Sequence, residues 1–137
     1  MSPRSADIEG KTLTPGTLYV VATPIGNLED LTFRALRVLQ QVDLIAAEDT
    51  RHSRKLCNFY AISTPLTSYF AHNEEAKGEK IIARLHQGAS VALITDAGTP
   101  AISDPGYLLV NSCRREGIPV ASVPGPSALV AALSISG

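Results

Sequence analysis

The chain has 137 residues, of which 45% are hydrophobic and 18% are charged, and its formal net charge at pH 7 is −1. This composition is typical of a globular protein, and the length is sufficient for one domain with its own hydrophobic core. The near-zero net charge excludes a general electrostatic attraction to phosphate-rich partners, so any contact with nucleic acid must depend on a local basic patch.

The sequence carries no signal for a membrane, for secretion or for a metal. Its apolar runs are too short to cross a bilayer, and the polar residues 1–11 lack the apolar segment of a secretory signal. We therefore expect a soluble, cytoplasmic protein with no membrane partner. Cys57 and Cys113 are far apart and have no C-x-x-C or His-rich spacing, so we predict neither a disulfide framework nor a metal site.

Strands and helices alternate along the chain after a polar stretch that we expect to be a flexible leader over residues 1–14. Residues 18–22 are apolar throughout, which is typical of a strand covered on both sides. A helix follows, with Asp30 as its expected N-cap, because the next apolar residues recur at helical spacing. Further strands are expected at 44–47, 66–70, 91–94 and 120–123. Further helices are expected at 50–58, 73–87, 104–116 and 127–134.

Five strands, each followed by a helix over short connections, predict an α/β fold with a parallel, doubly wound sheet and helices on both faces. Asp104 is expected to cap one of these helices, and Gly88 and Gly117 are expected to end two of them. We expect the domain to cover residues 15–137. Because the sequence ends at Gly137 directly after an expected helix, we expect it to be the first domain of a longer protein, with a second domain absent from this chain.

Three loops that follow expected strands combine proline with glycine. They are ATPIGN at 22–27, TDAGTPAISDPG at 95–106 and VPGPSA at 123–128. Proline fixes φ, and glycine lets the backbone approach a ligand closely. Because the carboxyl ends of parallel strands meet at one edge of a sheet, we expect the loops to form a rigid cradle for a small ligand. For any single loop, the alternative is that these residues only mark a turn.

The sequence of the first loop argues against a dinucleotide or a nucleoside triphosphate as the ligand. It lacks the G-x-G-x-x-G pattern of dinucleotide-binding folds, and it is not a phosphate-binding P-loop. A cradle with few cations suits a neutral or zwitterionic ligand that carries adenosine, because backbone amides and hydroxyl groups can bind its polar edges.

The three loops, together with LIAAEDTRHS at 44–53 and HNE at 72–74, closely resemble the bacterial ribosomal RNA small-subunit methyltransferase I family, a branch of the tetrapyrrole methylase superfamily. The resemblance covers residues 16–137. It implies that S-adenosyl-L-methionine is the cofactor. It also implies methylation of the ribose 2′-hydroxyl of a decoding-centre cytidine in the 16S ribosomal RNA of the small ribosomal subunit.

The resemblance has structural implications as well. It implies a first domain of five strands in the order 3-2-4-1-5, with the cofactor in the cleft between this domain and a second one. It further implies that the full-length protein is a homodimer. Because this chain supplies only half of such a site, we expect the isolated domain to be inactive.

The motifs of the resemblance assign seven positions to the cofactor. They are Pro24, Ile94, Thr95, Asp96, Thr99, Ser127 and Ala128. Pro24 is expected on the side of the sulfonium. Ile94 and Thr95 stand where the wider superfamily has two glycines, so their expected contacts come from the backbone.

A 2′-hydroxyl is a poor nucleophile, so the enzyme must position it in line with the methyl group and remove its proton. The candidate bases are Asp49, His52 and His72, and Glu48 and Asp104 also lie near the expected crevice. Each has a structural alternative, since acidic residues at a helix start act as caps or stabilise the helix dipole. The identity of the base is therefore left open.

The stretch TRHSRK at 50–55 contains the cationic cluster Arg51, Arg54 and Lys55 beside the same crevice. These side chains are candidates for contacts with ribosomal RNA phosphates, and Arg51 is the preferred one. The alternative is a solvated helix face with no ligand.

Two other functions remain open on the sequence alone. One is a different methyltransferase of the same superfamily, acting on a tetrapyrrole or on a modified protein residue. The other is a non-catalytic binding or dimerisation module on the same fold. The string AAEDTRH at 46–52 favours the RNA branch.

Overall fold

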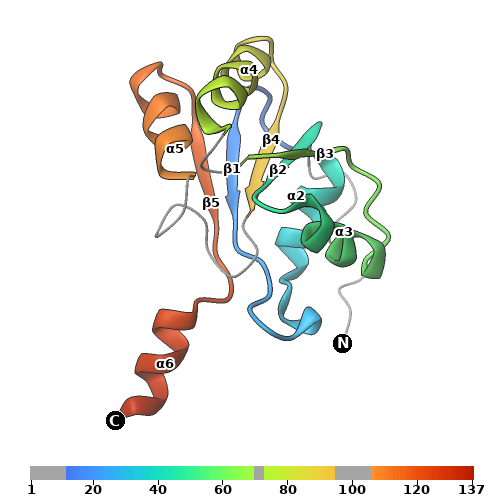
Figure 1. Cartoon of the computed structure of the whole chain (residues 1–137), viewed down its shortest axis with the longest axis vertical. Helices are drawn as coiled ribbons and strands as arrows, with labels where there is room; N and C mark the ends of the chain where they lie inside the picture. Colours follow the sequence, from blue (N-terminus) through green and yellow to red (C-terminus); the bar gives the residue numbers. More distant parts are fainter. Residues whose placement is uncertain (1–11, 70–72, 95–105) are drawn as a thin grey trace.

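The computed structural model describes residues 12–69, 73–94 and 106–137, and these contain one five-stranded sheet (Figure 1). Its strands are β1 (Leu18–Val21), β2 (Leu44–Ala47), β3 (Leu66–Ser68), β4 (Val91–Ile94) and β5 (Val120–Val123). Their order is β3-β2-β4-β1-β5, and every neighbouring pair is parallel. The predicted α/β class, the parallel sheet and the strand order are confirmed. The expected leader lies mostly outside the described residues.

Helices cover both faces of the sheet. They are the 3₁₀ helix η1 (Leu28–Asp30) and the α-helices α2 (Phe33–Gln41), α3 (Thr50–Phe59), α4 (Glu74–His86), α5 (Gly106–Arg115) and α6 (Ala128–Ser136). Helices α2 and α3 pack on one face, and α4 and α5 pack on the other. Figure 1 shows α6 extending away from the sheet. Within the described residues, no helix is both long enough and apolar enough to cross a membrane.

The core consists of two layers, one on each face of the sheet. Successive residues of a strand point to opposite faces, so β1 contributes Leu18 to one layer and Val21 to the other. Val21 packs in the same layer as Leu39 of α2, and Leu18 packs in the same layer as Ile81 of α4. Because β1, β2 and β4 are buried along their whole length, they need apolar residues at every position.

The predicted N-cap of α2 is wrong. Asp30 lies inside η1, whose own cap is Asn27, and the side chain of Asn27 accepts a hydrogen bond from the backbone N–H of Glu29 at 3.0 Å. The cap of α2 is Thr32, whose Oγ1 accepts a hydrogen bond from the backbone N–H of Ala35 at 3.0 Å. Aspartate and threonine are both good caps, and the short 3₁₀ turn moves the start of the helix past Asp30.

The two candidate caps predict different mutational effects. Thr32→Ala is expected to lower the free energy of unfolding by about 1 kcal/mol, because it leaves the first-turn N–H of α2 without its acceptor. Asp30→Ala removes an exposed side chain that does not cap α2, so its effect should stay within about 0.5 kcal/mol. Urea unfolding followed by circular dichroism measures both. A larger loss for Asp30→Ala would contradict the assignment.

The other element boundaries agree with expectation to within a few residues. Strand β3 ends at Ser68, two residues before the predicted end, although the backbone N–H of Tyr69 still donates to the carbonyl of Ala47 at 2.7 Å. Gly88 and Gly117 follow the ends of α4 and α5 with φ values of +95° and +72°, the conformation that glycine adopts after a helix. The expected cap Asp104 lies outside the described residues.

Helix α6 ends two residues later than predicted and differs from the other helices in its packing. Leu129, Val130 and Leu133 are each 63% exposed, and Ile135 is 87% exposed. These four side chains are therefore not part of either core layer.

Candidate functional site

The carboxyl ends of β1 and β4 lie side by side at the centre of the sheet (Figure 1). The chain that follows β1 leads to α2, whereas the helix that comes after β4 is α5, on the opposite face. In open parallel sheets, ligands bind where the connections of neighbouring strands leave on opposite faces. This edge, between β1 and β4, is therefore the position of the candidate site.

A small hollow of about 40 Å³ lies at this edge, and we name it the β1–β4 hollow. It is lined by Thr23, Pro24 and Leu28 after β1, by His52, Ser53 and Leu56 of α3, and by Ile94 of β4. Three of the predicted site residues thus line one hollow. Pro24 and Ile94 were assigned to the cofactor, and His52 is a candidate base.

The loop after β1 is held against α3 on one side of the hollow. The hydroxyl of Tyr60 donates a hydrogen bond to the backbone carbonyl of Leu28. Partial burial raises the pKa of this phenol, and the carboxylates of Glu29 and Asp30 raise it further. The phenol therefore stays protonated and able to donate at neutral pH.

Ser53 is a site residue that sequence reasoning missed. Its side chain is only 2% exposed, and within the described residues its Oγ is the buried side-chain polar atom that has no hydrogen-bond partner. The signal in the sequence is weak. Ser53 stands three and four residues before Leu56 and Cys57, so it shares the buried face of α3, where an apolar residue is usual.

The loops after β1 and β5 meet, as predicted. The backbone N–H of Ala22 donates to the carbonyl of Val123 at 3.1 Å. A Cβ atom on Gly125 would lie 3.1 Å from the Cβ of Ala22 and 3.7 Å from the Cγ2 of Thr32. The third loop of the expected cradle is outside the described residues, and the predicted cofactor residues in it lie there too. These are Thr95, Asp96 and Thr99.

Ser127 and Ala128, the remaining predicted cofactor residues, lie at the start of α6. Ser127 is the N-cap, and its Oγ accepts a hydrogen bond from the backbone N–H of Val130 at 3.4 Å. Ser127 is not among the described residues that line the β1–β4 hollow, so the structure does not bring it together with Pro24 and Ile94 there. The side chain of Ala128 lies outside what the structure describes.

Among the candidate bases, Asp49 is the N-cap of α3. Its Oδ1 accepts a hydrogen bond from the backbone N–H of Arg51 at 2.9 Å and lies 3.5 Å from the Nε of the same residue. The hydrogen bond from that backbone N–H is the main reason that the pKa of Asp49 is lowered. A carboxylate with a lowered pKa is a weaker base, so this geometry supports the capping alternative. His52 is exposed at the hollow, and His72 lies outside the described residues.

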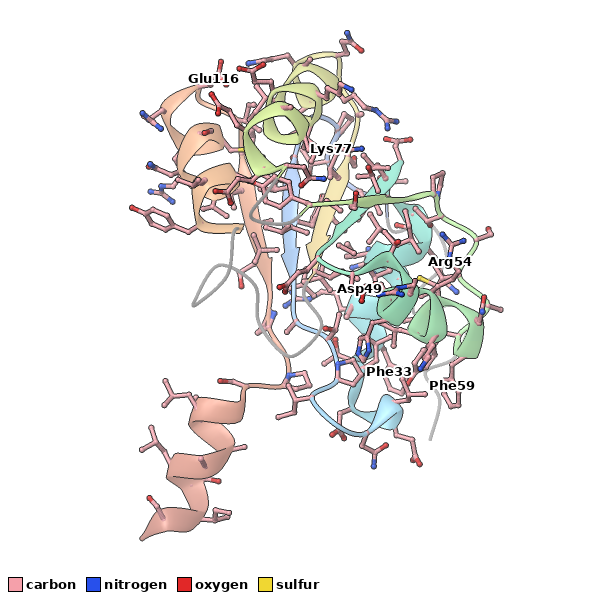
Figure 2. All side chains as sticks on the ribbon, in the orientation of Figure 1. Phe33, Asp49, Arg54, Phe59, Lys77 and Glu116 are labelled. Carbon is pink, nitrogen blue, oxygen red and sulfur yellow. The ribbon has the colours of Figure 1, made fainter. Side chains whose placement is uncertain are left out.

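The predicted cationic cluster forms one exposed surface, which we name the α3 basic face. Arg51, Arg54 and Lys55 are all exposed, and their spacing of three and four residues places them on the same side of α3. Figure 2 labels Arg54 on this helix and Asp49 at its start. His52 and Ser53 of α3 line the β1–β4 hollow, so the basic face and the hollow are built on the same helix.

A larger hollow of about 480 Å³ lies on the opposite face of the sheet, between α4 and α5. Its lining includes the carboxylates of Glu74, Glu75, Glu79 and Glu116. RNA phosphates would be repelled there, so this hollow is not the expected RNA site. Within the described residues, no three side chains of the His, Cys, Asp and Glu types are grouped so that they could hold a metal ion.

The sequence is similar to those of several bacterial proteins that share one name, ribosomal RNA small subunit methyltransferase I. The chain is 60% identical over 124 residues to the ribosomal RNA small subunit methyltransferase I of Xylella fastidiosa (strain Temecula1), covering 90% of this chain and 45% of that protein. It is 58% identical over 122 residues to the protein of the same name from Halalkalibacterium halodurans, covering 89% of this chain and 42% of that protein. The chain therefore spans less than half of the length of these relatives.

The fold agrees with a solved structure. A uroporphyrin-III-C-methyltransferase from Thermus thermophilus superimposes with a TM-score of 0.68 at 31% identity, covering 87% of this chain and 50% of that chain. The family model described as Tetrapyrrole (Corrin/Porphyrin) Methylases matches residues 17–137. The chain therefore belongs to the tetrapyrrole methylase family.

Proposed function

We propose that this chain is the cofactor-binding part of an S-adenosyl-L-methionine-dependent methyltransferase that acts on the ribose 2′-hydroxyl of a cytidine in 16S ribosomal RNA. The observation that carries the proposal is that α3 contributes both to the β1–β4 hollow and to an exposed basic face. One helix thus places a site for a small ligand next to a surface suited to phosphates. The name shared by relatives that are 58% and 60% identical supports the same function.

The residues at the crevice fit this cofactor. Among the described residues, no carboxylate or fixed cation lines the hollow, and the Oγ of Ser53, which has no partner among them, offers a hydrogen bond inside it. When bound, the cofactor would supply an electrophilic methyl group on its sulfonium. Pro24 and Ile94 would line its site. We propose that Thr95, Asp96, Thr99, Ser127 and Ala128 also contact it.

The chain also supplies candidates for proton removal. Of the two candidate bases that the structure describes, His52 lines the β1–β4 hollow and Asp49 does not. We propose that His52 accepts the proton of the 2′-hydroxyl and that Asp49 fixes the start of α3, which carries His52. The imidazole is suited to this step because a ring nitrogen of its neutral form can accept a proton.

The relatives are more than twice as long as the matched region, so we propose that a second domain completes the site and that residues 15–137 form the first domain. The complete protein is proposed to be a cytoplasmic homodimer that meets its RNA in the small ribosomal subunit. Methylation of isolated 30S subunits by the full-length protein tests the function. A protein that methylated a tetrapyrrole precursor and not the subunits would contradict it.

The α3 basic face makes a separate prediction. Replacing Arg51 and Arg54 with alanine in the full-length protein is expected to weaken binding to 30S subunits. The slope of log K against log salt should fall by about 2, because two phosphate contacts are lost. Filter binding at several salt concentrations measures both quantities.

The matched control for this experiment is the double variant Arg114→Ala and Arg115→Ala. These arginines are exposed in the last turn of α5, on the opposite face of the sheet, so the variant removes the same charge elsewhere. If both double variants changed the salt slope equally, the effect would come from net charge alone. The role of the α3 basic face would then be wrong.

A further inference from the structure

We propose that the β1–β4 hollow binds a sugar hydroxyl group and that Ser53 Oγ is its hydrogen-bond partner. The inference rests on the proposed function, because both the cofactor and the RNA substrate of that reaction contain ribose. It adds a binding residue that the sequence pattern does not identify.

The first argument is that the hydroxyl of Ser53 is buried without a hydrogen-bond partner among the described residues. The side chain is 98% buried, its Oγ has no hydrogen-bond partner within the described residues, and it lines the hollow. The backbone N–H of Ser53 continues the helix by donating to the carbonyl of Asp49 at 3.0 Å, so the helix does not need the hydroxyl. A buried hydroxyl without a partner is unfavourable for folding, and alanine would avoid that cost. The position therefore has the character of a binding site.

The second argument is the size of the hollow. Its volume of about 40 Å³ exceeds the roughly 10–15 Å³ that one water molecule needs and is well below the roughly 150 Å³ of a cavity that holds a benzene ring. A hydroxyl group, with or without a water molecule beside it, fits this space, whereas a nucleobase or a complete sugar does not. The bound group must therefore enter as the end of a larger molecule that lies outside.

The third argument is the chemistry of the lining. Four of the lining residues are apolar, Thr23, His52 and Ser53 are polar, and among the described residues no lysine, arginine or carboxylate lines the hollow. A charged group would lose its hydration there without gaining an ion-pair partner among these residues, so the lining favours a neutral group. A serine hydroxyl can both donate and accept, and it therefore matches another hydroxyl.

Two molecules in the proposed reaction could supply this hydroxyl. One is the ribose of the cofactor, and the other is the ribose of the RNA nucleotide. Both present the same chemistry to Ser53. Removing the Ser53 hydroxyl distinguishes them. It should raise the Kd of S-adenosylhomocysteine if the cofactor ribose is bound, and it should lower only kcat/KM on 30S subunits if the RNA ribose is bound.

The test uses the full-length protein and the variants Ser53→Ala, Ser53→Thr and Ser112→Ala. The threonine keeps a hydroxyl. Ser112 is a half-buried serine in the larger hollow between α4 and α5, so its alanine variant is the matched control. For each protein, calorimetry gives the Kd of S-adenosylhomocysteine, a methylation assay on 30S subunits gives KM and kcat, and thermal unfolding without ligand gives Tm.

Ser53→Ala is expected to leave the Tm of the ligand-free protein unchanged or higher, because no hydrogen bond is removed. It should also weaken the binding of either the cofactor or the RNA about tenfold, because one hydrogen bond to a neutral ligand is lost. A tenfold higher Kd for S-adenosylhomocysteine identifies the cofactor ribose. An unchanged Kd with a tenfold lower kcat/KM identifies the RNA ribose. Ser53→Thr should recover part of the loss, and Ser112→Ala should match the wild type.

Several outcomes would overturn the inference. If Ser53→Ala bound S-adenosylhomocysteine and methylated 30S subunits like the wild type, the hollow would hold only water. A markedly lower Tm for Ser53→Ala would show that the hydroxyl has a structural partner. If the wild-type protein neither bound S-adenosylhomocysteine nor methylated the subunits, the proposed function itself would fail, and this inference would fail with it.

Discussion

Replacing Gly125 with valine is expected to weaken the binding of S-adenosylhomocysteine by the full-length protein at least tenfold and to lower the free energy of unfolding by about 1 to 3 kcal/mol. The loops after β1 and β5 are in contact at this glycine, where even a Cβ atom would lie 3.1 Å from the Cβ of Ala22. Ala22 is fully buried, and its backbone N–H is bonded to β5, so it cannot move away freely. The two γ-carbons of valine would push the loops apart.

The cause of this effect is steric. Gly125 is not among the residues with positive φ, so its backbone conformation is accessible to valine. The matched control is Ser122→Val, which adds a side chain of the same kind at an exposed position of β5 and should change stability by less than about 0.5 kcal/mol. Equal effects of the two valines would show that contact between the loops is not the reason.

A double-mutant cycle makes the contact itself measurable. Gly125→Ala introduces only the Cβ atom, and Ala22→Gly removes the atom that it would meet. Combining them should cost less than the sum of the single changes, with a coupling of about 0.5 to 3 kcal/mol, because the close approach then disappears. Additive effects would mean that the two loops do not press on each other.

Alkaline pH is expected to destabilise the chain through Cys113. This residue is fully buried against the sheet, and burial raises the pKa of its thiol from 9.0 to about 11, with a further contribution from Glu116. Below pH 9 the thiol is protonated in both the folded and the unfolded chain, so it does not affect stability. Above pH 9 the unfolded chain loses the proton first, so the folded state is progressively disfavoured up to about pH 11.

Between pH 8 and pH 10.5, the unfolding free energy should fall by about 2 kcal/mol from this thiol alone. Urea unfolding under reducing conditions measures the fall. Other groups titrate in the same range, including Cys57 and Tyr60, whose pKa values are also raised. The variant Cys113→Ala retains them, so the difference between wild type and variant isolates Cys113. If the free energy of unfolding fell equally with pH in the wild type and in Cys113→Ala, the prediction for Cys113 would be wrong.

The regular part of the fold could be predicted from local pattern. Strands β1, β2 and β4 are covered on both faces, and such strands must be apolar at every position. Gly88 and Gly117 mark helix ends because few other residues adopt positive φ without strain. The strand order came from the family resemblance. Hydrophobic periodicity reports which face a residue occupies and not which strand lies beside it.

The predicted helix start at Asp30 shows where local pattern is insufficient. Asp30 and Thr32 are both suitable caps, and they stand two residues apart. The choice between them depends on the 3₁₀ helix η1, which Asn27 caps. Asp30 is the last residue of η1, so α2 can only begin after it. A cap is decided by the backbone on both sides of it, and composition gives only the candidates.

The site was predicted in part for a similar reason. Pro24 and Ile94 belong to unusual strings at strand ends, so motif comparison finds them. Ser53 stands in the middle of a polar helix segment, where a serine carries no particular signal. What distinguishes it is burial without a partner, and that property exists only once α3 is packed against the sheet.

The exposed apolar side chains of helix α6 affect how ligand affinities of this chain can be measured. It presents leucine, valine and isoleucine side chains to water on a segment that extends from the body of the domain. Water-exposed apolar surface of this kind favours association between copies at the concentrations that calorimetry needs. An affinity measured on these 137 residues alone would then combine ligand binding with self-association, which is why each binding experiment is designed for the full-length protein.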